Sequence, residues 1–168
     1  MSLEIEIKFT LNGRAVQAKV PPVMTTLTML REKFDLTGGK LACGEGECGA
    51  CTVKIDDRTI NSCLMFAVDC DGREIQTIEG LGAVGGLETM QQAFVEHGAI
   101  QCGYCMPGMI MQARYVVDQN TKNAGNDSAG RMTRDDIARG LEGNVCRCSG
   151  YTKVVDAVAA VVLEEASK

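Results

Sequence analysis

The segment ACGEGECGACTV, residues 42–53, brings three cysteines together in one short stretch, and a fourth cysteine follows at position 63. The resulting spacing, Cys43-x4-Cys48-x2-Cys51 with Cys63 downstream, is that of plant-type [2Fe–2S] sites. Three thiolates can converge from one tight loop while the fourth reaches in from a neighbouring segment. The spacing therefore predicts an iron–sulfur site in the N-terminal half of the chain.

Three glycines, Gly44, Gly46 and Gly49, are interspersed with these cysteines. They allow the loop to wind round a cluster, because glycine reaches positive φ without a Cβ penalty. Their N–H groups can also point at the sulfurs and tune the cluster. A zinc ribbon is the alternative, but zinc sites favour paired Cys-x2–4-Cys knuckles, which a single loop with three cysteines fits less well.

A second set of cysteines lies in the C-terminal half, as Cys102-x2-Cys105 and Cys146-x1-Cys148. Both pairs are expected at helix ends, which a helical bundle can bring together. Taken alone, this set could bind zinc or act as a Cys-x-x-Cys redox switch, although a switch leaves the second pair unexplained. The iron–sulfur loop upstream favours a second [2Fe–2S] cluster here, since a second cluster would give the first one a partner for electron transfer.

The chain contains nine cysteines, so one remains outside the two sets. A disulfide framework is disfavoured by the odd count and by the absence of an export signal at the N-terminus. The remaining cysteine, Cys70, follows an apolar run and is expected to be a small buried thiol. The single histidine, His97, is expected at a helix end and on the surface.

Composition and charge exclude several classes of function. The net charge of −5 and the lack of a basic run disfavour a nucleic-acid or anionic-membrane partner. Hydrophobic residues make up 45% of the chain, which is enough for a packed core. The longest apolar stretch near the end, residues 154–163, is interrupted by Asp156 and is too short for a membrane span. A cytoplasmic protein is expected.

The hydrophobic patterns change from strand-like to helical along the chain. Alternating residues, the Asn12-Gly13 turn signal and the Gly38-Gly39 stop predict an α+β N-terminal unit. Its strands are expected over residues 3–10, 15–20, 52–55 and 74–78, with a helix capped by Thr25 or Thr26. Beyond it, helices are expected over residues 87–96, from Pro107 to about Gln119, from Thr133, and over residues 151–165, with a loop over residues 120–130. The predicted domains are residues 1–78 and 87–168, joined by a glycine-rich linker over residues 79–86.

Four segments together resemble a known family, the small iron–sulfur subunits of the molybdenum hydroxylases, the xanthine dehydrogenase group. They are ACGEGECGACTV (42–53), the run from Asn61 to Leu81, QCGYCMPGMIM (101–111) and GNVCRCSGY (143–151). Met106 and Ser149 stand where many members have threonine, and neither change removes a ligand. No G-x-G-x-x-G sequence, P-loop or molybdenum pocket is visible, so the chain is expected to lack its own substrate site.

The resemblance implies a β-grasp ferredoxin-like domain followed by a four-helix bundle, each with one [2Fe–2S] cluster. It implies a large partner subunit with a molybdopterin cytosine dinucleotide-type cofactor and a medium subunit with FAD, assembled as a dimer of heterotrimers. Gln101 and Cys148 would approach the pterin. The implied substrate is an N-heteroaromatic such as quinoline, with carbon monoxide as the alternative. A free-standing ferredoxin and a zinc-stabilised interaction module are the alternatives from other classes.

Overall fold

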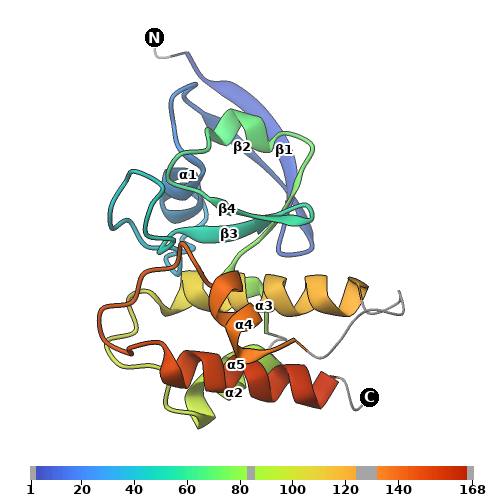
Figure 1. The fold of residues 1–168 in the computed structure, drawn as a ribbon. Helices are drawn as coiled ribbons and strands as arrows, with labels where there is room; N and C mark the ends of the chain where they lie inside the picture. Colours follow the sequence, from blue (N-terminus) through green and yellow to red (C-terminus); the bar gives the residue numbers. More distant parts are fainter. Residues whose placement is uncertain (1–2, 83–85, 124–131, 166–168) are drawn as a thin grey trace.

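A computed structural model describes residues 3–82, 86–123 and 132–165 of the chain. A half built on a β-sheet stacks on a helical half, as Figure 1 shows. The strands are β1 (Ile5–Leu11), β2 (Arg14–Val20), β3 (Thr52–Ile55), β4 (Arg58–Asn61) and β5 (Glu74–Gln76). The α-helices are α1 (Thr26–Lys33), α2 (Thr89–Glu96), α3 (Met106–Asn123), α4 (Arg134–Gly140) and α5 (Thr152–Glu165), with short 3-10 turns η1 (Ala67–Cys70) and η2 (Ile78–Gly80).

The five strands form one mixed sheet in the order β2-β1-β5-β3-β4. β1 pairs antiparallel with β2 and parallel with β5, so the first strand lies inside the sheet. The sheet and α1 enclose a core that includes Ile7, Phe9, Met29 and Ile75. Because the Cys43–Cys51 loop connects α1 to β3, this core holds both ends of the loop in place.

The expected N-terminal elements are present, with two differences. The Asn12-Gly13 turn joins β1 to β2, and Thr25 caps α1 by accepting a hydrogen bond from the backbone N–H of Thr28 at 3.2 Å. The expected strand over residues 74–78 ends at Gln76, because η2 begins at Ile78. β4 was not predicted: its four residues give too short a pattern to recognise, and its pairing with β3 specifies it instead.

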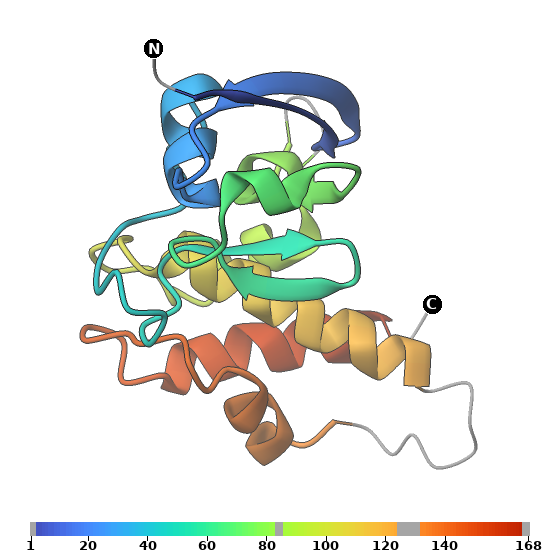
Figure 2. The same ribbon diagram turned by 90° about the horizontal axis from the view of Figure 1, so that it is seen from above.

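The C-terminal half packs four helices, α2 to α5, around a second core. Met90, Phe94, Met109, Ile137 and Val158 are fully buried in it. Figure 2 shows α3 lying between the sheet and α5, and α3 contacts β3 directly. No helix of the described part of the chain is long and apolar enough to cross a membrane.

The loop expected over residues 120–130 begins later than predicted. α3 runs to Asn123, so residues 120–123 of the expected loop are helical, and residues 124–130 lie outside the described residues. Residues 120–123 continue a helix whose preceding turns place Ala113 and Val117 in the core, and this tertiary packing outweighs the modest propensity of polar residues for loops. The linker predicted over residues 79–86 begins inside η2, where Glu79 accepts a hydrogen bond from the backbone N–H of Gly38 at 2.7 Å. The domain boundaries themselves stay a prediction.

Arg114 of α3 joins three helices of the C-terminal half. Its guanidinium pairs with Glu165 at the end of α5, with Glu88 at the start of α2 and with Asp118 of α3, at distances from 2.6 to 3.3 Å. Only 14% of the arginine side chain is exposed. Although burial opposes its charge, pairing with Glu165 and Asp118 raises the pKa of Arg114 above its usual range.

We expect Arg114→Met to lower the free energy of unfolding of the full chain by about 2 kcal/mol, measured by urea denaturation. Removing the guanidinium leaves three partly buried carboxylates close together without their cation. Arg134→Met is the matched control, because its ion pair with Asp156 is exposed and should contribute less than about 1 kcal/mol. Equal losses in the two variants would contradict this assignment.

Candidate metal centres

The first cysteine set lies in the loop between α1 and β3, with Cys63 just after β4. Gly44, Gly46 and Gly49 of this loop have φ values between 67° and 80°. Asn61, the last residue of β4, fastens the loop by donating a hydrogen bond from Nδ2 to the carbonyl of Gly46 at 2.5 Å. Sequence reasoning missed this anchor, because an asparagine at a strand end carries no ligand signal.

The four thiols of the first set lie as two neighbouring pairs. Cys43 and Cys48 are neighbours, and so are Cys51 and Cys63. The backbone N–H of Glu45 and the Cys48 thiol lower the pKa of exposed Cys43 to about 6. Burial raises the pKa of Cys51 to about 11. A buried thiol of this kind becomes a thiolate when a metal replaces its proton.

The second cysteine set also lies as two pairs. Cys148 Sγ lies 3.5 Å from Cys102 Sγ, and Cys105 is a neighbour of Cys146. Each pair therefore joins one cysteine from the segment before α3 to one from the segment between α4 and α5. This pairing could not be read from the spacing, which groups Cys102 with Cys105.

Burial differs within the second set. Cys102 and Cys148 are exposed, whereas Cys146 is buried and Cys105 half-buried. Burial raises the pKa of Cys105 to about 12. Burial works in the same direction on Cys146, but hydrogen bonds from the hydroxyl and the N–H of Ser149 prevail and lower its pKa. The pair of Cys105 and Cys146 is thus shielded by the protein, and the pair of Cys102 and Cys148 faces outward.

Hydrogen bonds connect the two cysteine loops directly. The N–H of Val145 donates to the carbonyl of Cys48 at 2.9 Å. Asn144, which is buried, donates from Nδ2 to the carbonyl of Gly49 at 3.0 Å. Tyr104 Oη donates to the carbonyl of Leu41 at 2.7 Å. Only one backbone hydrogen bond therefore separates Cys48 from the residue that precedes Cys146.

Close backbone approach makes this contact possible. A Cβ on Gly108, in the first turn of α3, would clash with the carbonyl of Gly49 and lie 3.2 Å from the carbonyl carbon of Ala50. A Cβ on Gly49 would clash with Asn144 and with the carbonyl of Gly143. Both glycines lie inside the cysteine motifs, but their role between the halves was not predicted, since spacing shows nothing of through-space contacts.

The donor set fits a [2Fe–2S] cluster in each half. In the described part of the chain, no three His, Cys, Asp or Glu side chains surround one point as the ligands of a single ion would. A [2Fe–2S] cluster makes a different demand, namely four thiolates shared between two irons. Each half supplies four thiols as two adjacent pairs.

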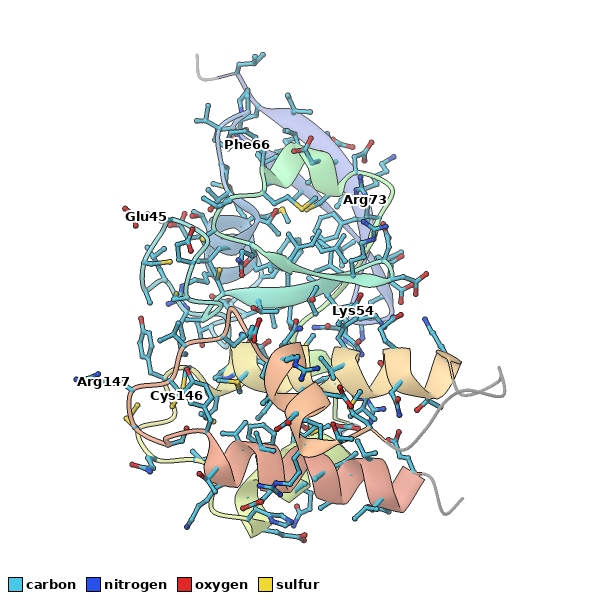
Figure 3. The ribbon with its side chains drawn as sticks, in the orientation of Figure 1. Glu45, Lys54, Phe66, Arg73, Cys146 and Arg147 are labelled. Carbon is cyan, nitrogen blue, oxygen red and sulfur yellow. The ribbon has the colours of Figure 1, made fainter. Side chains whose placement is uncertain are left out.

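Both cysteine loops lie on the same side of the molecule. Figure 3 shows Glu45 of the first loop and Arg147 of the second pointing away from the body of the protein on that side. Gln101, next to Cys102, is exposed, as is His97 at the end of α2. Cys70 is fully buried, as predicted, and its Sγ lies 3.3 Å from Thr26 Oγ1.

Comparison with known proteins matches both halves to iron–sulfur families. The family described as 2Fe-2S iron-sulfur cluster binding domain matches residues 9–77, and that described as [2Fe-2S] binding domain matches residues 77–159. The nicotinate dehydrogenase small FeS subunit of Eubacterium barkeri is 41% identical, over 92% of this chain and 93% of the relative. The xanthine dehydrogenase iron-sulfur-binding subunit of Escherichia coli O157:H7 is 40% identical, over 92% of each chain.

This chain belongs to the small iron–sulfur subunits of the molybdenum hydroxylases. Among solved structures, quinoline 2-oxidoreductase from Pseudomonas putida 86 is similar to it, with a TM-score of 0.88 and 36% identity over 98% of this chain and 96% of the other. The small subunit is therefore an electron-transfer component of a multi-subunit oxidoreductase. The family resemblance inferred from the four sequence segments is confirmed.

Proposed function

We propose that this small subunit passes electrons from a molybdopterin site on a large partner to FAD on a medium partner. The observation that carries the proposal is the direct backbone contact between the two cysteine loops, from Val145 N–H to the carbonyl of Cys48. It supports two redox centres held next to each other in one chain. When bound, a [2Fe–2S] cluster takes up and gives back single electrons.

The proposed ligands of the N-terminal cluster are Cys43, Cys48, Cys51 and Cys63, and those of the C-terminal cluster are Cys102, Cys105, Cys146 and Cys148. Within each set, the thiol pairs described above would each hold one iron. Gly44, Gly46 and Gly49 would shape the first cluster loop. The protein's own contribution is to hold the thiols at fixed positions and to bury part of each set from water.

The exposed thiols support a location for each partner. Cys102 and Cys148 face outward beside Gln101, so we propose that this edge meets the large subunit and that Gln101 and Cys148 approach its pterin. Cys43 is exposed in the other loop and would face the medium subunit. A dimer of such heterotrimers, with a molybdopterin cytosine dinucleotide-type cofactor, is part of the same proposal.

We further propose an N-heteroaromatic substrate for the assembled enzyme. The relatives named for nicotinate and xanthine and the structure named for quinoline support this class, since all three compounds are nitrogen heterocycles. No observation on the described residues favours carbon monoxide.

The β-grasp and four-helix-bundle architectures are proposed for the two halves, supported by their separate cores. A cytoplasmic location stays a prediction.

Low-temperature EPR of the dithionite-reduced protein, with iron quantified on the same sample, tests the proposal. We expect two signals with different relaxation and about four irons per chain, the sum for two [2Fe–2S] clusters. A single signal would show that only one of the two proposed clusters is present. Bound zinc without any signal would overturn the electron-transfer function of this chain.

A further inference from the structure

Ser149 directs two hydrogen-bond donors at a single cysteine sulfur. Its Oγ donates to Cys146 Sγ at 3.1 Å, and its backbone N–H donates to the same sulfur at 3.4 Å. Cys146 is buried, with 8% of its surface exposed. A hydrogen bond in such surroundings is screened little by water, so its electrostatic effect on the sulfur is strong.

A second hydrogen bond orients the serine hydroxyl. The backbone N–H of Tyr151 donates to Ser149 Oγ at 3.2 Å, which occupies the acceptor side of that oxygen and leaves its proton directed at Cys146 Sγ. The chain turns back in this way because Gly150 and Tyr151 have φ values of 60° and 65°. Such a conformation is uncommon for a tyrosine and persists only where its surroundings hold it.

Hydrogen bonds of the Tyr151 hydroxyl stabilise this conformation. Tyr151 Oη accepts a hydrogen bond from the N–H of Cys146 at 2.8 Å and donates to the carbonyl of Asn144 at 3.3 Å. Asn144 is in turn anchored to the carbonyl of Gly49. The serine hydroxyl is thus positioned by a closed set of hydrogen bonds that reaches the neighbouring cysteine loop.

The arrangement is particular to the second cysteine set. Among the described residues, Cys146 is the one proposed ligand whose sulfur accepts a hydrogen bond from a side-chain hydroxyl. In the first set, Cys43 Sγ accepts from the backbone N–H of Glu45 at 3.4 Å. The nearby Ser62 hydroxyl donates to the carbonyl of Cys51 instead, at 2.7 Å.

We propose that the Ser149 hydroxyl, acting through Cys146, raises the reduction potential of the C-terminal cluster relative to that of the same site without it. The inference rests on the proposed function, since it takes Cys146 as an iron ligand. Reduction adds one electron to the site and neither forms nor breaks a bond. The added negative charge spreads onto the ligand sulfurs, and a donor aimed at one of them stabilises the reduced form.

The test is an EPR-monitored redox titration of the full chain loaded with its clusters, comparing wild type, Ser149→Ala and Ser149→Thr. In Ser149→Ala we expect the ratio of reduced to oxidised C-terminal cluster to fall about tenfold at a given potential, a shift of about 59 mV for one electron. Ser149→Thr keeps a hydroxyl and should retain the wild-type midpoint. Ser62→Ala is the matched control, and it should leave the C-terminal midpoint unchanged.

Two results would overturn the inference. An unchanged midpoint in Ser149→Ala would show that the hydroxyl does not influence the site. Loss of the C-terminal signal in Ser149→Ala, with about half of the iron, would make Ser149 an assembly residue and not a tuning residue. Failure of the proposed function looks different from either, because it would remove the iron-dependent signals from the wild-type protein.

Discussion

Cys48→Ser should remove the EPR signal of the N-terminal cluster and leave that of the C-terminal cluster, while Cys105→Ser should do the reverse. Each variant should retain about two of the four irons expected for two [2Fe–2S] clusters. The physical reason is that each thiol belongs to one pair: Cys48 adjoins Cys43, and Cys105 adjoins Cys146. Serine is a poorer ligand for iron than a thiolate, so the pair that would hold one iron is broken.

Cys70→Ser is the control for this pair of variants. Cys70 is fully buried, and its thiol is already within 3.3 Å of Thr26 Oγ1, so a serine hydroxyl there finds a partner. Burial raises the pKa of the Cys70 thiol, in keeping with a neutral core residue. Both signals and the full iron content should survive. Loss of either signal in Cys70→Ser would refute the ligand assignment.

Gly108→Ala should destabilise the chain by about 2 kcal/mol, although alanine is the better helix former by about 1 kcal/mol. Gly108 lies in the first turn of α3, where an added Cβ would meet the backbone of Gly49 and Ala50. Backbone atoms cannot rotate away as a side chain does. The two halves would therefore have to separate, straining the hydrogen bond from Val145 N–H to the carbonyl of Cys48.

Urea denaturation of the iron-loaded chain measures this effect, and Gly86→Ala is the matched control. A Cβ at Gly86 would have no atom within 4 Å, and its φ lies outside the left-handed region, so alanine there should be neutral or slightly stabilising. The sign of the change in the free energy of unfolding of Gly108→Ala shows whether the backbone clash or the helix propensity of alanine dominates. A more stable Gly108→Ala protein would show that helix propensity dominates and that the halves do not approach so closely.

Local patterns predicted most of the secondary structure, and the exceptions are short or polar segments. The β1–β2 hairpin and α1 follow from turn and capping signals that lie within a few residues of each other. The helix start expected at Thr133 was predicted for the same reason, and Thr133 and Asp136 form the capping box that begins α4. β4 was missed because its four residues give too short a pattern, and the last turn of α3 because its polar residues are typical of loops.

The sequence by itself determined which family this chain belongs to and which eight cysteines are the candidate ligands. Ligand spacing is a local property, since several thiolates must reach one cluster from a short loop, and it can be read without coordinates. The pairing of Cys102 with Cys148 and of Cys105 with Cys146 was decided by the tertiary structure alone. So was the contact between the two loops through Asn144 and Val145, because it depends on the packing of α3 against β3 and on backbone approach at Gly49 and Gly108.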